Sequence, residues 1–233
     1  MELFISNLFS DNAADRFYFL AVALTVVISI VLHELAHGWA AIRLGDYTPM
    51  RLGRMTGNPM VHMGPYSLVV LALVGIAWGR MPIDPTRLKG RHAEAMVSGA
   101  GPAVNLILAL LALTAMALML RAWDLSALHP LLFFYGTPEV AELVEPWQFS
   151  ALRFMAIAGV YNLLLAIFNL IPVPPLDGSH IVGSYARPYA EFVGNSRHQG
   201  FMLMIFVFGF FLVGQVLTPW AIAGMNFWVG LLT

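Results

Sequence analysis

Long apolar stretches alternate along the chain with shorter segments that are rich in Arg, Gly and Pro. A helix needs about 20 mostly apolar residues to cross a bilayer. Stretches of about that length cover residues 17–42, 95–120, 154–176 and 199–217. The pattern predicts an all-α polytopic membrane protein with about four to six membrane helices, in a single domain over residues 1–233.

Two further apolar segments are too short to be assigned as simple spans. Residues 66–79 have the length of a re-entrant or core element, and residues 219–233 follow Thr218-Pro219, a pair that divides the last apolar stretch. The segment before residue 66 is rich in Gly, Pro, Arg and Thr, which predicts a loop or a β-hairpin after the first helix.

Composition supports a lipid environment and excludes several functions. The chain is 59% hydrophobic and 11% charged, whereas soluble domains are about a quarter charged. A net charge of −1 provides no basic surface for nucleic acid. The absence of cysteine excludes disulfides and thiolate metal sites. The first residues lack a positively charged segment, so we expect no cleaved signal peptide.

The distribution of Lys and Arg predicts an orientation. If residues 66–79 do not cross, the loops 43–64, 80–94 and 178–198 lie on one side of the membrane. These loops contain nine of the twelve Lys and Arg, namely Arg43, Arg51, Arg54, Arg80, Arg87, Lys89, Arg91, Arg187 and Arg197. The positive-inside rule makes this side cytoplasmic and leaves the N-terminus outside.

Three ionisable residues interrupt the first apolar stretch, in the sequence HELAH. His33 and His37 are four residues apart and therefore lie on one face of a helix, where both can reach one metal ion. Glu34 lies beside them, as in zinc hydrolases whose carboxylate takes a proton from the metal-bound water. The alternative interpretation is a hydrogen-bonded packing cluster.

A catalytic zinc usually has three protein ligands, and without cysteine the third must be His, Asp or Glu. Asp177 is the candidate, although Asp-Gly is also a common turn pair. Asp177 can meet HELAH only after an even number of crossings between them. Residues 95–120 and 154–176 provide two, in agreement with the charge distribution. Two His and one Asp would also suit non-haem iron.

Several motifs together resemble the site-2 protease family of intramembrane zinc metalloproteases (peptidase family M50). They are HELAH, SGAGPAVN at 98–105 and NLIPVPPLDG at 169–178. Two further segments, GRMTGNPMVH at 53–62 and AWGRMPID at 77–84, resemble a short bacterial and archaeal branch without PDZ or CBS modules. The chain departs from that branch at Arg80 and Met81, which both lie in a loop.

The resemblance implies one Zn²⁺ per chain, bound by His33, His37 and Asp177, with Glu34 as general base. It implies a transmembrane protein or peptide as substrate, in a prokaryotic cell membrane. The charge distribution, together with the position of HELAH in its span, predicts that the active site lies toward the cytoplasm. The resemblance favours substrate or oxyanion binding by Asn105 and Asn169, which could equally be interhelical hydrogen-bonding residues.

Asn162 lies seven residues before Asn169 on the same helix face, and we assign it to packing. His180 is outside the motif and is interpreted as a histidine at headgroup level, with a gate, a pH-sensitive neighbour or a further ligand as alternatives.

Two other functional classes compete with a protease. A transporter or metal carrier also places polar groups in membrane spans, but it needs a second polar cluster to form a path. A catalytically inactive relative of the same fold would bind membrane helices without cutting them, and an intact Glu34 argues against it. Neither the physiological substrate nor the oligomeric state follows from the sequence.

Overall fold

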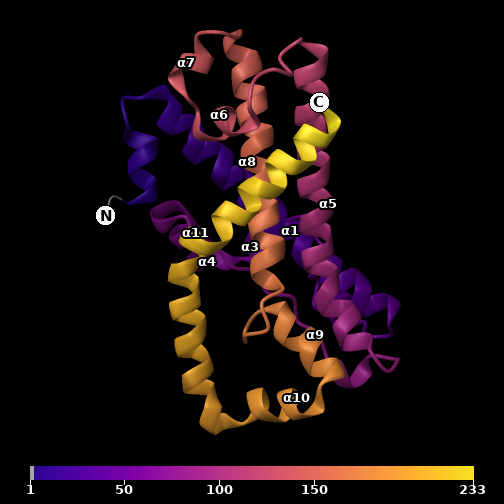
Figure 1. Ribbon diagram of the computed structural model, residues 1–233. Helices are drawn as coiled ribbons and strands as arrows, with labels where there is room; N and C mark the ends of the chain where they lie inside the picture. Colours follow the sequence, from indigo (N-terminus) through magenta and orange to yellow (C-terminus); the bar gives the residue numbers. More distant parts are fainter. Residues whose placement is uncertain (1–2) are drawn as a thin grey trace.

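The computed structural model describes residues 3–233, apart from the side chains of residues 199 and 210–213. Figure 1 shows a helical molecule. In chain order the elements are η1 (Phe4–Phe9), α1 (Ala13–Arg43), α2 (Thr48–Arg51), α3 (Pro59–His62), α4 (Gly64–Val74), η2 (Pro85–Arg87), α5 (Ala93–Ala122), α6 (Pro130–Tyr135), α7 (Pro138–Ala141), α8 (Pro146–Asn169), α9 (Asp177–Tyr185), α10 (Arg187–Gly194) and α11 (Ser196–Leu232).

Helices α1, α5 and α8 are each long and apolar enough to cross a membrane. Helix α5 packs against both α1 and α8 along its length. Small residues allow this approach: a Cβ added at Gly159 of α8 would lie 2.3 Å from a methyl of Leu113 on α5. The buried core between them includes Met116, Ile157 and Val160, so the three helices form one packed unit.

Helix α11 provides the fourth candidate span, as a bent pair. Its parts Ser196–Gly209 and Gly214–Leu232 meet at an angle of 58°. The second part lies across α5 and α8 and buries Met225 and Val229 completely (Figure 1). The helix continues through Pro219, where we expected a division. One missing backbone hydrogen bond is tolerated in an apolar helix, and the bend lies earlier in the chain.

We expected a loop or a β-hairpin after the first helix, and the β-hairpin is absent, because residues 3–233 contain no strand. The segment after α1 instead forms the single-turn helices α2 and α3, each with a proline in its first turn. Residues 76–84 have no regular secondary structure, and we call them the strap. The backbone pairs once with α3, where the Arg80 N–H donates to the carbonyl of His62, which is too little for a ladder.

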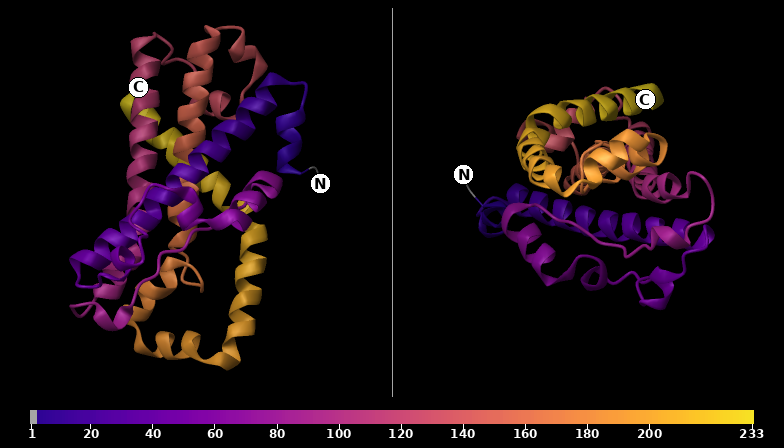
Figure 2. Two further views of the ribbon diagram at one scale, coloured as in Figure 1. Left: turned by 180° about the vertical axis from the view of Figure 1, so that it is seen from behind. Right: turned by 90° about the horizontal axis from the view of Figure 1, so that it is seen from below.

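Helix α4 is the only part of residues 66–79 that is helical, and its eleven residues are too few to span a bilayer. In Figure 2 α1 separates two layers, with α2 to α4 and the strap on one side and α5, α8 and α11 on the other. The candidate site residues of α1 therefore lie between two neighbours of different construction.

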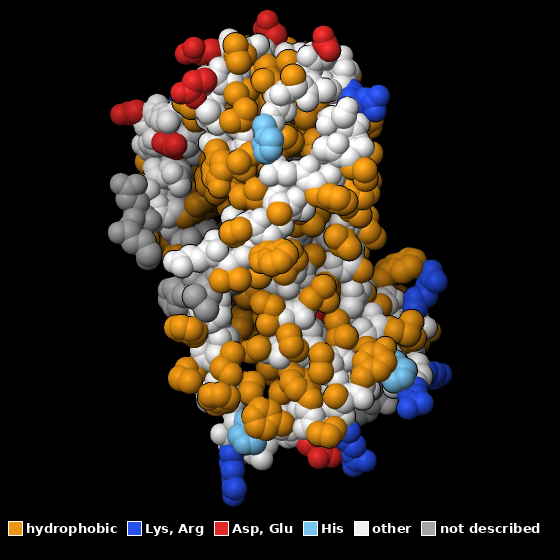
Figure 3. Space-filling model, in the orientation of Figure 1, with side chains coloured by type: hydrophobic (Ala, Val, Ile, Leu, Met, Phe, Trp, Pro, Cys, Tyr) orange, Lys and Arg blue, Asp and Glu red, His pale blue; other side chains and the backbone are white. Residues whose placement is uncertain are grey.

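Helix α8 ends at Asn169, seven residues before the expected end of the third span. The prolines at 172, 174 and 175 lack the N–H groups that a helix would need. The chain crosses from α8 to α9 in a short irregular segment, and Asp177 is the first residue of α9. Figure 3 shows the visible Asp and Glu mainly at the α6–α7 end, and most Lys and Arg near the α9–α10 end.

Candidate metal centre

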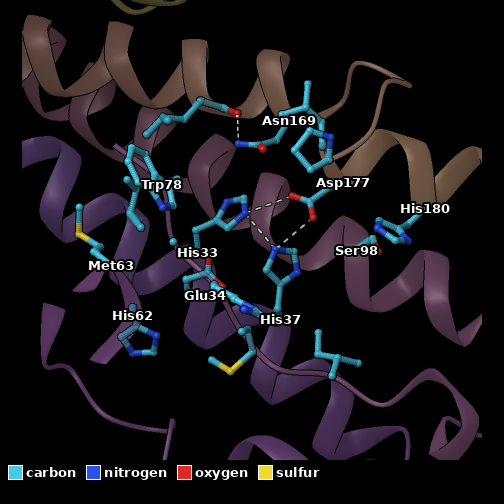
Figure 4. A pocket seen from close by; sticks show the side chains of 18 of the residues that line it. His33, Glu34, His37, His62, Met63, Trp78, Ser98, Asn169, Asp177 and His180 are labelled. Atoms are coloured by element: carbon cyan, nitrogen blue, oxygen red, sulfur yellow. Dashed lines mark hydrogen bonds and ion pairs between the residues drawn. The ribbon is translucent and has the colours of Figure 1, made fainter. Parts of the chain in front are cut away.

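His33, Glu34 and His37 are buried in the second half of α1, with exposed fractions of 6–7%. His33 lies ten residues before the end of α1, about 15 Å along the helix axis. The site therefore lies within a helix that is long and apolar enough to cross a membrane, and not at the helix end. The four-residue spacing places both imidazoles on the side of α1 that faces α5 and α9 (Figure 4).

Asp177, the first residue of α9, lies beside the two histidines although it is distant from them in the sequence. The distances are 3.1 Å from His33 Nε2 to Asp177 Oδ2, 3.4 Å from His37 Nε2 to Asp177 Oδ1, and 2.9 Å between the two Nε2 atoms. A tetrahedral zinc with ligands at 2.0–2.1 Å separates any two of them by about 3.3 Å. Figure 4 shows the three side chains converging on one point, with the spacing that a single ion requires.

The protonation of these groups also favours a cation. His33 Nδ1 is 2.5 Å from Asn105 Oδ1, and His37 Nδ1 is 2.8 Å from the carbonyl oxygen of Val97. Both oxygens accept, so in each neutral imidazole the proton is on Nδ1 and Nε2 presents a lone pair. Asp177 Oδ2 is buried without a hydrogen bond. Lone pairs that converge without a donor are satisfied by a metal ion.

Gly101 of α5 leaves the space that an ion would occupy. A Cβ at this position would lie 2.5 Å from the Nε2 atoms of both His33 and His37. Any side chain here would collide with the nitrogen atoms that face Asp177. The residues of this chain therefore fit a resident zinc by ligand type, spacing and free space.

Glu34 lines the same cavity as the three ligands and lies against the strap. A Cβ added at Gly79 would lie 2.4 Å from Glu34 Oε1 and 2.8 Å from a methyl of Ile30. The strap thus runs directly over the carboxylate. The Ser67 hydroxyl holds the strap here, because it donates to the carbonyl of Trp78 and accepts from the same residue's N–H at 2.7 and 2.8 Å.

Asp46 anchors the far end of the strap. It is completely buried, and its carboxylate accepts from the N–H groups of Thr48 at 2.9 Å and Asp84 at 2.8 Å. Burial alone would raise the pKa of Asp46, but the hydrogen bonds from Thr48 and Asp84 outweigh it and lower the pKa. Asp46 had no signal in the sequence, because a single acid in a loop resembles any solvated residue.

An open cavity of about 1220 Å³ lies over the cluster. Residues of α1, α5, α8, α9, α11 and the strap line it. Asn169 is on the cavity wall, and its side-chain amide donates to the carbonyl of Leu165 in its own helix. Trp78 and Phe206 line the same space, which makes the wall largely apolar.

The two remaining polar candidates are placed differently. Asn105 is fully buried, and both ends of its side chain are engaged, with His33 and with Asn162. Asn162, which we assigned to packing, thus contacts the site through Asn105. His180 lies beside Ser98, to one side of the three ligands (Figure 4), and pairs with Glu94 at 3.0 Å across a partly exposed surface.

A family model agrees with this geometry. The model of peptidase family M50 matches residues 21–213, from the first half of α1 to the bend of α11. The chain belongs to peptidase family M50. The family resemblance that the motifs indicated is confirmed, over a somewhat longer part of the chain than the motifs cover.

Curated relatives of this M50 protein are bacterial. The chain is 32% identical over 222 residues to "Putative zinc metalloprotease YwhC" of Bacillus subtilis strain 168, covering 91% of this chain and 93% of the relative. It is 26% identical over 210 residues to "Putative zinc metalloprotease Rip2" of Mycolicibacterium smegmatis, covering 87% and 70%. No solved structure matches the chain.

Proposed function

We propose that this M50 protein is an intramembrane endopeptidase that hydrolyses peptide bonds within transmembrane segments of its substrates. The chain is a zinc metalloprotease, by its family and its relatives. The observation that carries the finer proposal is the position of the cluster. Three side chains that could hold a metal ion converge beside α1, a helix long and apolar enough to cross a membrane, and an open cavity lies over them.

His33, His37 and Asp177 would hold the zinc. A zinc ion with an open fourth position supplies Lewis acidity and brings the pKa of a bound water toward neutrality. The protein's part is to present three deprotonated ligand atoms at the correct spacing. Nδ1 of each histidine is occupied by an oxygen acceptor, so both rings present Nε2 to the ion.

Glu34 is the general base in this proposal. It follows His33 directly in α1 and lines the cavity. The carboxylate takes a proton from the attacking water and gives it to the leaving amine nitrogen. The strap shields this exchange from bulk water, because Gly79 lies against the Glu34 side chain.

The substrate must present an extended segment to this site. A membrane helix hides its carbonyl groups in hydrogen bonds four residues apart, so it must unwind locally before attack. We expect substrates with Gly, Pro or Asn near the cut. Asn169 is the cavity residue that we propose as a contact for the unwound backbone, and oxyanion binding by Asn105 would require Asn105 to leave His33.

The orientation is part of the proposal. Most Lys and Arg lie at the α9–α10 end, so we place that end in the cytoplasm and the N-terminus outside a prokaryotic cell membrane (Figure 3). The metal-carrier alternative has no specific support. Within residues 3–233, His33, His37 and Asp177 form one such group, with no second group to continue a path.

The test compares Glu34→Gln with Asp177→Ala in purified protein, by zinc content and by cleavage of a transmembrane peptide in liposomes. We expect Glu34→Gln to keep one zinc per chain and to lower the cleavage rate by about 10²- to 10⁴-fold. Asp177→Ala should lose both zinc and cleavage. Zinc retained in Asp177→Ala would refute the ligand set, and full cleavage by Glu34→Gln would refute the assigned base.

A further inference from the structure

A chain of hydrogen bonds runs from the metal centre into the interface of three helices. His33 Nδ1 lies 2.5 Å from Asn105 Oδ1, Asn105 Nδ2 lies 3.1 Å from Asn162 Oδ1, and Asn162 Nδ2 lies 2.9 Å from the carbonyl oxygen of Ala158. His33, Asn105 and Asn162 are 7%, 0% and 3% exposed. These hydrogen bonds link α1 to α5 and α5 to α8, away from water.

The carbonyl of Ala158, at the end of this series, determines the direction of every hydrogen bond in it. The carbonyl of Ala158 can only accept, so the NH₂ group of Asn162 must face it. The Asn162 oxygen then faces α5 and accepts from the NH₂ group of Asn105. The Asn105 oxygen is left for His33, whose Nδ1 must carry the proton.

The orientation of the Asn105 amide therefore determines the tautomer of His33, with the proton on Nδ1. An amide side chain can rotate by 180° and exchange its oxygen for its NH₂ group at little cost in shape. If Asn105 were reversed, its NH₂ group would face Nδ1, and the proton of the neutral imidazole would move to Nε2. A protonated Nε2 has no lone pair for a metal ion.

We propose that Asn162 is a positioning residue for the zinc site, which acts by holding the Asn105 amide in the one orientation that leaves His33 Nε2 free for the metal. The inference rests on the proposed ligand set. It gives Asn162, two side chains away from the ion, a specific role in metal affinity.

A comparison with His37 shows why only His33 needs a residue such as Asn162. Its Nδ1 donates directly to the backbone carbonyl of Val97, which cannot reverse. His33 has a side-chain amide in that place, and a side-chain amide needs a further residue to orient it. The backbone carbonyl of Ala158 provides the fixed reference at the end of the relay.

The test is a double-mutant cycle on zinc affinity, measured by competition with a chromophoric chelator in detergent. Asn162→Leu should weaken zinc binding by about 10- to 100-fold, as for other outer-shell partners of zinc ligands. Asn105→Asp should keep zinc binding, because either carboxylate oxygen accepts from His33. In the Asn105→Asp background, Asn162→Leu should cause no further loss, since a carboxylate needs no orientation.

A merely structural Asn162 would give a different result. The loss would then be the same in both backgrounds, and the proposal would be overturned. Asn169→Leu is the matched control, because Asn169 lies on α8 and its side chain donates to the carbonyl four residues earlier, not to a proposed ligand. Its zinc affinity should equal that of the wild type.

A second readout is independent of zinc affinity and of catalysis. Nitrogen-15 NMR of histidine-labelled, zinc-free protein reports which ring nitrogen of His33 carries the proton. We expect Nδ1–H in the wild type and a population of Nε2–H in Asn162→Leu. An Nε2–H tautomer in the wild type would overturn the relay. A wild type that binds no zinc would refute the proposed site itself, which separates the two failures.

Discussion

The proposed ligands on α1 lie between two walls of different construction (Figure 2). The inner wall consists of the long helices α5 and α8, and it contacts both histidines through fully buried groups. The outer wall is the strap, which is irregular, partly exposed and held by side-chain bonds to Ser67 and Asp46. The inner wall orients the metal ligands, and the outer wall covers Glu34 and borders the cavity.

This difference indicates that the two walls have separate roles. A metal site requires ligand atoms held to within a few tenths of an ångström, which packed helices provide. Substrate entry requires a wall that can adapt, and short segments without a continuous hydrogen-bond ladder are suited to that. Changes to the inner wall should therefore affect zinc first, and changes to the strap should affect activity or stability while zinc remains.

The largest effect is expected from Gly101→Ala, on the inner wall. The new methyl would lie 2.5 Å from Nε2 of both His33 and His37, so we expect zinc binding to be lost. Helix stability should not fall, because Ala favours helix by about 1 kcal/mol over Gly. Metal analysis of the purified protein measures the outcome.

Gly99→Ala is the control for that change. It lies two residues earlier on α5, and its added Cβ would have 4.0 Å to the nearest atom. It should bind zinc as the wild type does. Equal zinc content in the two variants would mean that the space beside Gly101 is not the metal position.

An intermediate effect is expected from Gly79→Ala, on the strap. The added Cβ would lie 2.4 Å from Glu34 Oε1, so the carboxylate must move. Displacement of a catalytic group by about 1 Å costs on the order of 10²-fold in rate. We expect that decrease in the rate of cleavage with one zinc still bound. Gly57→Ala, with nothing near its added Cβ, should retain full activity, and loss of zinc in Gly79→Ala would contradict the separation of the two walls.

The smallest effect is expected from Asp46→Asn, at the anchor of the strap. The pKa of Asp46 is lowered in the folded protein, so its carboxylate stabilises the fold above the unfolded pKa of about 3.9. At pH 7 the variant should lose about 1–2 kcal/mol of unfolding free energy. The difference from the wild type should shrink as the pH falls through the lowered pKa.

Thermal unfolding in detergent at several pH values measures this difference. Asp11→Asn, at an exposed position of the N-terminal segment, is the matched control and should change stability little at any pH. A stability loss in Asp46→Asn that stays constant down to pH 3 would show that the charge of Asp46 does not hold the strap.

The sequence was most informative where a motif lay within one helix, or where other residue types could be excluded. HELAH specifies its geometry by itself, since residues four apart share a helix face. Asp177 could be found because the chain has no cysteine, and because charge and span count agreed on two crossings. The structure brings Asp177 to both histidines, and the family model matches the chain that carries them.

The expected β-hairpin failed for a physical reason. Gly, Pro and polar residues break regular structure, but they do not say whether the pieces pair as strands or coil into single turns. That choice depends on available partners, and the strap finds one backbone bond to α3 and side-chain anchors elsewhere. The bend of α11 before Pro219, in place of a division at the proline, is a further example.

The sequence by itself determined the long helices and the family, and it predicted the lipid environment and the ionisable residues of the site, because each depends on composition or on spacing along one segment. Only the tertiary structure decided that Asn162 reaches His33 through Asn105, that Gly101 leaves room between the histidines, and that the strap covers Glu34. These relations join segments far apart in the chain. They depend on which faces of the helices meet, and packing alone decides that.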